Sequence, residues 1–377
     1  MRAMRLPVIP SSAPSPAASG FDTGPRSIAA VKVLRISVTD RCNFRCVYCM
    51  PADGVPWLAK DDILTFEEIA DVVRAAVEVH GITRFKLTGG EPTVRHGIVE
   101  LIRILRTIRG VTDLSLTTNG LLLGDLARPM KDAGLDRVTV SLDSLRPERF
   151  RRITRTGDLA TVLRGLDVAE TAGFDAIKVN CVTMRGTNDD EIVDFALLSL
   201  ARDLTVRFIE YMPLGDAALM HTGSTERQVD RSEIGPAGGC SAQDRGGDAL
   251  VPEAIVRVTI ERELGPLVPV PRDSETGVGP ANVYRLARGN PIGRIGFISA
   301  MSAPFCSSCN RLRLTADGVL RSCLFEGGEV DIRSILRRET DRATRLQHLA
   351  RAMTDCVRLK PDVHSAHGNE QMSRIGG

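Results

Sequence analysis

From residue 31 onward, short β-rich runs alternate with segments whose apolar residues recur at helical spacing. Such alternation is typical of an α/β fold in which helical crossovers connect the strands of a parallel sheet. Six units of this kind favour an incomplete (β/α)6, TIM-like barrel over a closed ring of eight. The predicted strands span residues 33–38, 85–88, 114–117, 138–142, 177–182 and 206–211.

Unusual residues follow the carboxyl ends of these strands, where barrels of this type carry their chemistry. A cysteine-rich loop follows the first strand, and Gly89-Gly90-Glu91-Pro92 follows the second. The third, fourth and sixth strands run into segments 117–120, 141–144 and 210–213. Each of these turns is common by itself, but together on one rim they indicate a functional site.

Basic side chains interrupt four of the predicted strands, namely Arg35, Lys86, Lys178 and Arg207. Strands of a parallel barrel are covered on both faces, so a cation in mid-strand points into the lumen or lies at its mouth. An unpaired buried ion costs several kcal/mol, whereas a domain is stable by only about 5–15 kcal/mol. Glu91 and Glu210 are available carboxylates but too few, so we expect a ligand that carries several phosphates.

The chain has nine cysteines, and most of them fall in two triplets, Cys42, Cys46 and Cys49 and then Cys306, Cys309 and Cys323. Thiolates are the usual ligands of iron–sulfur clusters, and three of them leave one iron of a [4Fe–4S] cube open to a small molecule. Arg311 and Arg313 alternate after Cys309, so both should point to one side, beside that cluster. Arginine forks suit phosphates and the edges of purines.

Two other interpretations of the cysteines stay open at this point. The first triplet lies at i, i+4 and i+7, a spacing that also lines the apolar face of a helix. Either triplet could belong to a zinc site, although zinc usually takes four ligands and His364 and His367 are far from Cys323 in sequence. The scattered cysteines, Cys181, Cys240 and Cys356, are predicted not to bind metal.

Composition changes mark the rest of the domain organisation. Residues 1–30 are rich in Ala, Pro and Ser and predict a disordered leader, with an organelle transit peptide as the alternative. Residues 31–215 form the predicted barrel, and 216–252 form a polar, glycine-rich insertion. Residues 253–377 form a C-terminal region with the second cluster, and further strands are predicted at 254–260, 283–286 and 293–298.

The composition is that of an ordinary soluble globular chain, 43% hydrophobic and 25% charged with a net charge of +2. No apolar run approaches membrane-spanning length, so an integral membrane protein is not expected. The near-neutral charge argues against non-specific nucleic-acid binding as the main activity. No signal peptide is visible, and metal-binding thiols survive in a reducing cytosol, so we expect a cytoplasmic protein.

The first triplet, with Tyr48 before its third cysteine, resembles the cluster motif of radical S-adenosylmethionine (SAM) enzymes. The Gly-Gly-Glu-Pro run is similar to the motif with which that superfamily binds the methionine amino group. Segment 34–42, the second triplet with Asn310-Arg311-Leu312-Arg313, and the terminal Gly376-Gly377 resemble one family within it, the GTP 3′,8-cyclases of molybdenum cofactor biosynthesis. The resemblance covers residues 31–215 and 290–377.

The resemblance implies two [4Fe–4S] clusters and a radical reaction in which no side chain is assigned as a catalytic group. SAM bound at the first cluster would be cleaved, after one-electron reduction, to a 5′-deoxyadenosyl radical that takes hydrogen from the ribose C3′ of GTP. The carbon radical would close onto C8 of a guanine held by the second cluster, giving (8S)-3′,8-cyclo-7,8-dihydroguanosine 5′-triphosphate. Positions that match SAM contacts are Tyr48, Gly90, Ser141 and Met212. Positions that match GTP contacts are Arg35, Lys86, Thr117, Lys178, Arg311 and Arg313, and Gly376-Gly377 matches a tail that reaches the active site.

The resemblance has one departure at the GTP positions, because the family often carries arginine where this chain has Lys86, and lysine lacks the planar fork. It also implies partners, namely an external one-electron donor of flavodoxin or ferredoxin type and a cyclic pyranopterin monophosphate synthase that receives the product. A homodimer stays open. The alternatives are a radical SAM peptide maturase with an auxiliary cluster and a non-catalytic metal module, either an electron carrier or a zinc-stabilised binding protein.

Overall fold

The six predicted strands form the first part of the barrel sheet. The computed structural model describes residues 24–214, 247–271, 279–289, 291–365, 368 and 372–376. All six predicted barrel strands are confirmed to within one residue at each end, as β1 Val33–Ser37, β2 Arg84–Thr88, β3 Asp113–Thr118, β4 Arg137–Ser141, β5 Ala176–Thr183 and β6 Thr205–Glu210. Each strand pairs in parallel with the next, so their carboxyl ends lie on one rim.

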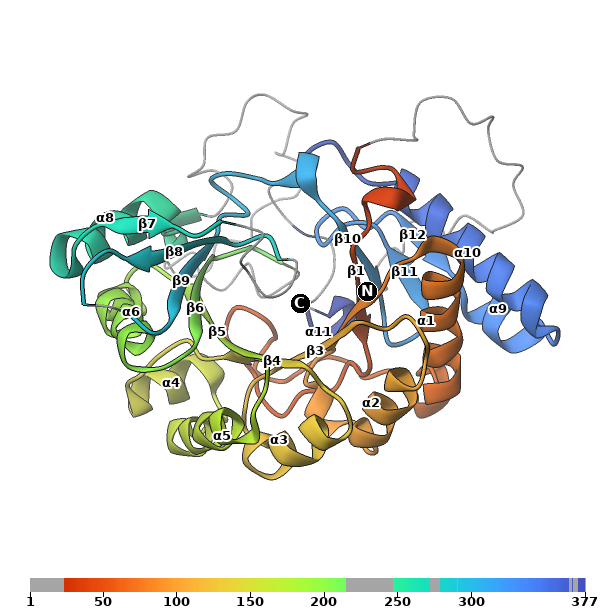
Figure 1. The fold of residues 1–377 in the computed structure, drawn as a ribbon, viewed down its shortest axis with the longest axis horizontal. Helices are drawn as coiled ribbons and strands as arrows, with labels where there is room; N and C mark the ends of the chain where they lie inside the picture. Colours follow the sequence, from red (N-terminus) through yellow and green to blue (C-terminus); the bar gives the residue numbers. More distant parts are fainter. Residues whose placement is uncertain are drawn as a thin grey trace.

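Helices follow these strands and cover the outer face of the curved sheet (Figure 1). They are α1 Phe66–His80, α2 Ile98–Arg106, α3 Leu123–Asp132, α4 Pro147–Thr154, α5 Leu159–Ala172 and α6 Ile192–Ala201. Helix α1 begins at a capping box, in which the side chains of Thr65 and Glu68 each accept a hydrogen bond from the other's backbone N–H. Ile69, Val72 and Val73 are then buried at helical spacing, so the main core lies between helices and strands.

The C-terminal region extends the same sheet at both edges. Its strands are β7 Leu267–Pro269, β8 Asn282–Leu286, β9 Arg294–Ile298, β10 Arg311–Leu314, β11 Val319–Arg321 and β12 Glu329–Asp331. Strand β10 pairs in parallel with β1, and β9 pairs in parallel with β6. The full order is β12-β11-β10-β1-β2-β3-β4-β5-β6-β9-β8-β7. The strand that follows Cys306 and Cys309 is therefore part of the barrel wall.

Two of the three further predicted strands are confirmed, because 283–286 lies in β8 and 293–298 coincides with β9 except at its first residue. The strand predicted at 254–260 is wrong, since this segment lies in helix α8 Glu253–Leu264. Its β-branched residues favoured a strand, but strand propensity depends strongly on context. Val256 and Ile260, one helical turn apart, are buried on one face of the helix instead.

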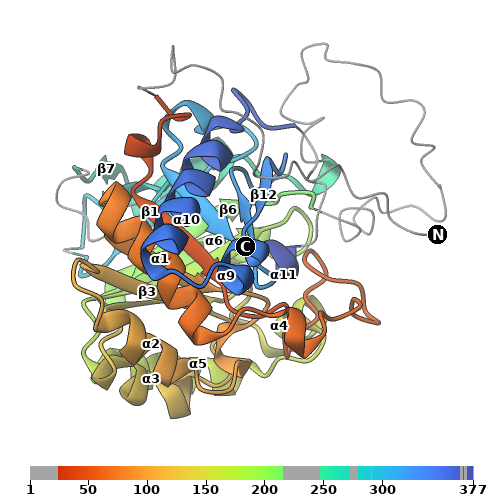
Figure 2. The ribbon, with the colours of Figure 1, turned by 90° about the vertical axis from the view of Figure 1, so that its right-hand side faces the viewer.

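In the described part of the chain, the last helices are α9 Arg333–Arg338, α10 Arg342–Arg358 and α11 Met372–Ile375. Helix α10 packs beside α1 (Figure 2). Arg345 Nη1 lies 2.6 Å from Asp71 Oδ2 between them. Helix α11 lies inside the curve of the sheet (Figure 1). Single turns of 3-10 helix occur at Ile28–Ala30, Lys60–Asp62, Pro92–Val94, Asp189–Glu191, Gly247–Ala249 and Cys306–Ser308.

Much of the predicted leader and insertion, 1–23 and 216–246 with Cys240, lies outside the described residues. Residues 24–30 are described and contact the C-terminal region, because Arg26 Nε donates a hydrogen bond to the Lys360 carbonyl at 2.8 Å. Among the described helices, none is both long and apolar enough to span a membrane.

Because one face of α10 is buried, shortening a side chain on that face is expected to destabilise the protein strongly. We expect Leu349→Ala, at a side chain with no exposed surface, to lower the free energy of unfolding by about 2–5 kcal/mol, because it leaves a cavity. Leu359→Ala, at a side chain that is 40% exposed, should change it by about 0.5 kcal/mol or less. Denaturant unfolding of anaerobically purified protein compares the two, and equal losses would contradict the packing of α10.

Candidate active site

A cavity of about 270 Å³ lies inside the barrel and is called the central cavity below. Inward-facing side chains of β1–β6 and β10 form much of its wall, because alternate residues of a strand point to opposite faces. The predicted site residues that line it are Arg35, Tyr48, Lys86, Thr117, Ser141, Lys178, Met212, Cys306, Cys309, Arg311, Arg313 and Cys323. The fold therefore brings most of the predicted site residues together around one cavity.

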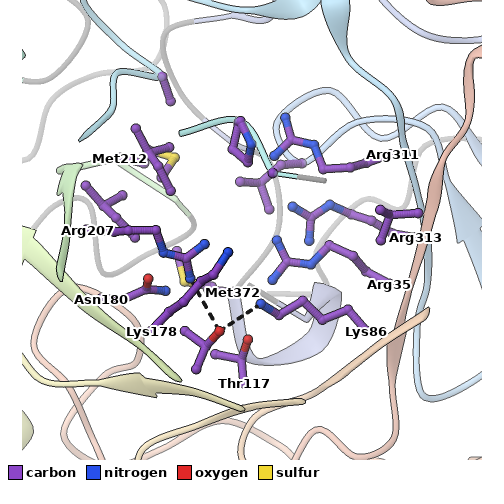
Figure 3. Close-up of a pocket in the computed structure, with 18 of the residues that line it drawn as sticks. Arg35, Lys86, Thr117, Lys178, Asn180, Arg207, Met212, Arg311, Arg313 and Met372 are labelled. Carbon is purple, nitrogen blue, oxygen red and sulfur yellow. Dashed lines mark hydrogen bonds between the residues drawn. The ribbon is translucent and has the colours of Figure 1, made fainter. Parts of the chain in front are cut away.

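Basic side chains project into the central cavity from facing walls. Figure 3 shows Arg35, Arg311 and Arg313 on one wall and Lys178 and Arg207 on the other. The parallel pairing of β1 with β10 places Arg35 directly beside Arg313. The prediction that the mid-strand cations face the lumen is confirmed for Arg35, Lys86, Lys178 and Arg207.

The two carboxylates considered as partners for these cations bind elsewhere. Glu91 accepts hydrogen bonds from Thr118 Oγ1 at 2.7 Å and from the backbone N–H of Asn119 at 2.6 Å. Glu210 accepts hydrogen bonds from the backbone N–H groups of Met301 and Ser302, each at 2.8 Å. Both carboxylates thus stabilise loops at the rim rather than the lumen cations.

Three of the lumen cations form hydrogen bonds but no ion pair with a carboxylate in the described part of the chain. Lys86 Nζ and Arg207 Nη2 both donate to Thr139 Oγ1, at 3.2 and 3.4 Å. Arg313 Nη1 donates to the Gly376 carbonyl at 2.6 Å. Arg207 and Arg313 are only 7% and 5% exposed, so water does little to solvate them, and an anionic ligand would stabilise them.

Burial and mutual repulsion destabilise the charged forms of these groups. Burial first, and then the nearby Arg207, lower the pKa of Lys86 well below its usual value. Burial and the neighbouring Arg311 lower the pKa of Arg313 to about 9, and burial lowers the pKa of Arg207 to about 10. An anion in the central cavity would oppose each of these shifts, because it favours the charged form.

The second triplet lies at the amino end of β10. Cys306 and Cys309 precede this strand, and the antiparallel pairing of β10 with β11 returns the chain so that Cys323 reaches the same end. All three are half-buried free thiols that line the central cavity. Arg311 Nη2 lies 3.9 Å from Cys309 Sγ, so the predicted placement of this arginine beside the triplet is confirmed.

The electrostatics of Cys309 favour a thiolate. Burial raises its pKa, but Arg311, Lys360 and a hydrogen bond from the backbone N–H of Arg311 outweigh burial and leave the pKa below its ordinary value. Three soft sulfur donors without a disulfide partner fit an iron–sulfur cluster with one open iron.

His364 is close to the second triplet in space, although it is far from it in sequence. Its backbone N–H donates a hydrogen bond to Cys306, and its ring stacks on Phe325 with centroids 4.1 Å apart. Both ring nitrogens lie near backbone carbonyls, Nε2 at 2.8 Å from Ala300 O and Nδ1 at 2.6 Å from Ser365 O. The ring therefore does not present a nitrogen to the sulfurs as a zinc ligand would. His367 lies outside the described residues.

The first triplet lies at the opposite end of the central cavity. Because β1 and β10 are parallel, the loop after β1 and the turn before β10 stand at opposite ends of the barrel. Cys42, Cys46 and Cys49 are half-buried free thiols in this loop, which is not helical, so the interpretation as an apolar helix face is wrong. They do not line the cavity, but Tyr48 does. The three thiols again fit a cluster, because burial raises their pKa values and a bound metal would offset that cost.

Gly90 lies against the start of the first triplet rather than in the cavity wall. Its N–H donates to the Thr39 carbonyl at 2.8 Å, and the N–H of Glu91 donates to the Arg41 carbonyl at 2.8 Å. A Cβ at Gly90 would lie 2.4 Å from the Arg41 carbonyl oxygen and 2.5 Å from that of Asp40. The two loops thus pack backbone to backbone, which only glycine allows.

Several residues of the site were not among the predicted site residues. Tyr48 donates a hydrogen bond to Asp143 Oδ2 at 2.7 Å, and burial raises the pKa of Asp143 to about 6. Asn180 lies two residues after Lys178, on the same inward face of β5. The period of two along each strand could have identified Asn180. Phe325, His364 and Met372 also line the cavity, but they come from loops and a short helix, where no such period exists.

Family models match two adjacent parts of the chain. Residues 36–198 match the model described as "Radical SAM superfamily". Residues 233–366 match the model described as "Molybdenum Cofactor Synthesis C".

Curated relatives match nearly the whole chain. A GTP 3′,8-cyclase of Pelotomaculum thermopropionicum is 44% identical over 92% of this chain and 98% of its own length. The GTP 3′,8-cyclase of Moorella thermoacetica is 46% identical with the same coverage. That of Pseudomonas entomophila is 42% identical over 89% of this chain and 90% of its own length.

A solved structure supports the fold. The SuiB protein of Streptococcus suis, bound to S-adenosylmethionine, superposes with a TM-score of 0.53 at 12% identity and covers 78% of this chain and 60% of its own. At this identity the likeness concerns the fold alone.

The close backbone contact at Gly90 predicts that a larger residue there lowers both stability and iron binding. We expect Gly90→Ala to destabilise the protein by about 1–3 kcal/mol and to lower the iron bound by the first triplet, because the new Cβ meets backbone atoms that cannot move aside. Gly124→Ala is the matched control, since no atom lies within 4 Å of its Cβ. Melting temperature and iron content measure both effects, and a Gly90→Ala protein as stable and iron-loaded as the control would contradict this packing.

Proposed function

The chain belongs to the GTP 3′,8-cyclase family of radical SAM enzymes, and we propose that the central cavity holds its substrate between the two cysteine triplets. The enzyme converts GTP to (8S)-3′,8-cyclo-7,8-dihydroguanosine 5′-triphosphate in molybdenum cofactor biosynthesis, with [4Fe–4S] clusters and SAM as cofactors. The observation that carries the proposed placement is that Arg207 and Arg313 are buried in the cavity wall and pair with no carboxylate among the described residues.

We assign one cluster to each triplet, Cys42, Cys46 and Cys49 to the first and Cys306, Cys309 and Cys323 to the second. When bound, the first cluster with SAM supplies the radical, and the protein orients the reactants and excludes water. Tyr48, Ser141 and Met212, which line the cavity, and Gly90, which packs against the first triplet, are the proposed contacts of SAM. The bond from Tyr48 to Asp143 fixes the ring toward the cavity.

We assign the triphosphate of GTP to the basic walls. Lys86, Lys178 and Arg207 lie together on the inward faces of β2, β5 and β6, and they would supply charge to phosphate oxygens. Thr117 lies among them at the cavity wall. Arg207 is an addition to the positions that the family resemblance indicated, and its contact with Thr139, which also binds Lys86, supports it.

We assign the guanine and ribose to the end formed by the second triplet. Arg311 and Arg313 lie beside these sulfurs, and Arg35 is paired in register with Arg313. Arg313 also donates a hydrogen bond to the Gly376 carbonyl, and the C-terminal segment lies toward the first triplet, because the backbone N–H of Ser373 donates to Cys49 and Gly376 packs against Ser37 and Thr88. Gly377 lies outside the described residues.

The remaining partners are proposed from the chemistry of the reaction. SAM cleavage requires one electron, so an external donor of flavodoxin or ferredoxin type would act in the cytoplasm. The cyclised triphosphate would pass to a cyclic pyranopterin monophosphate synthase. A homodimer is compatible with these assignments, and none of them requires it.

The direct test is an anaerobic assay of the reconstituted protein with SAM and a reductant, with and without GTP. We expect 5′-deoxyadenosine and a cyclised guanosine triphosphate to form together, and only when GTP is present. Equal 5′-deoxyadenosine in both reactions with no GTP consumed would count against the proposed function.

The buried cations predict a loss of GTP affinity when one is removed. We expect Arg207→Ala and Arg313→Ala each to raise the Kd for GTP about tenfold to a hundredfold, because each removes charged hydrogen bonds worth about 1.5–3 kcal/mol. Arg103→Ala is the control, since Arg103 pairs with Glu100 on the exposed face of α2. Equilibrium binding measures all three, and GTP affinities equal to that of the control would refute the assignment.

A further inference from the structure

A buried lysine lies behind the second triplet and outside the wall of the central cavity. Lys360 follows α10, is 4% exposed, and donates a hydrogen bond from Nζ to the Cys309 carbonyl at 2.9 Å. Its own carbonyl accepts a hydrogen bond from Arg26 Nε at 2.8 Å. Its backbone N–H donates to the Val357 carbonyl at 3.1 Å. Both the backbone and the ammonium group of Lys360 are therefore held in place.

No carboxylate in the described part of the chain forms an ion pair with Lys360. Two nearby acids are engaged with arginines, Glu329 with Arg321 at 2.6 Å and Asp355 with Arg358 at 3.5 Å. The neighbouring Cys356 is buried, and its Sγ lies 3.2 Å from the Gly328 carbonyl oxygen, which places it as a thiol that donates. A buried ammonium without a counter-ion costs several kcal/mol, and one neutral carbonyl does not offset this.

A cluster bound at the second triplet would bring negative charge beside this ammonium group, because Lys360 is in direct contact with Cys309. Lys360 touches the backbone of one ligand directly, and that ligand's sulfur is also approached by Arg311 from the cavity side. Cys309 therefore lies between two cations, one facing the substrate and one facing away from it. Three thiolates around a [4Fe–4S] core carry net negative charge, and reduction of the core adds to it.

We propose that Lys360 is a positioning residue that offsets the charge of the second cluster and raises its reduction potential. The inference rests on the proposed function, since it requires that the second triplet hold a cluster. A fixed cation stabilises the reduced, more negative cluster more than the oxidised one. Because Lys360 does not line the cavity, its effect on the cluster is separate from contact with GTP.

The test is an anaerobic redox titration of the full-length reconstituted protein, followed by electron paramagnetic resonance. A full-length protein in which Cys42, Cys46 and Cys49 are all replaced by alanine identifies the signal of the second cluster. We expect Lys360→Met to shift its potential to a more negative value and Lys360→Arg to keep it near that of the wild type. Lys32→Met is the matched control and should cause no shift, because Lys32 Nζ also binds a backbone carbonyl, that of Ala29 at 2.9 Å, but is exposed.

An unchanged potential in Lys360→Met, or equal shifts in the methionine and arginine variants, would overturn the proposal. If Lys360→Met binds less iron at the second triplet, Lys360→Arg must restore both the iron content and the potential, and iron loss that arginine does not restore also overturns it. Failure of the wild type to cyclise GTP would contradict the proposed function instead. The potential shift is measured without GTP, so the two failures are distinguishable.

Discussion

Repulsion among buried cations is the constraint on which the rest of this structure depends. Lys86, Arg207 and Arg313 enter one cavity from different strands, and burial together with neighbouring cations lowers the pKa of each. A buried ion without a partner costs several kcal/mol, a large share of the roughly 5–15 kcal/mol by which domains are stable. Such an arrangement is stable in the presence of a polyanion, and it provides binding free energy that a neutral ligand would not obtain.

The strand topology places these cations between the two cysteine triplets. Strand β10 pairs in parallel with β1, so the loop that follows one strand and the turn that precedes the other lie at opposite ends of the same wall. The first triplet occupies that loop, Cys306 and Cys309 lie in that turn, and Cys323 reaches the same end after β11. Arg35 and Arg313 lie side by side between the two triplets. In the proposed assignment, a substrate held by these cations would span the distance between the two thiol sites. Lys360 lies behind the second site, where its ammonium group donates a hydrogen bond to the Cys309 carbonyl.

Local patterns predicted much of this arrangement, and long-range pairing explains what they missed. The period of two placed Lys86 and Lys178 in the lumen, and cysteine spacing identified both triplets. No local pattern indicated that β10 would pair with β1, or that His364 would return to Cys306. The helix at 253–264 was mistaken in part for a strand, because β-branched residues favour strands only where the context is pleated. Gly90 was identified from a motif. The reason that glycine is needed there, the close contact with the Arg41 carbonyl, is visible only in three dimensions.

The central claim is that the cavity recognises its substrate through several phosphates. It is tested most directly by measuring the Kd values of guanosine, GMP, GDP and GTP under anaerobic conditions at one fixed ionic strength. The account predicts that affinity rises with each added phosphate and that GTP loses most affinity when salt is increased, because the contacts are charged. Guanosine binding as tightly as GTP, with no dependence on salt, would contradict it.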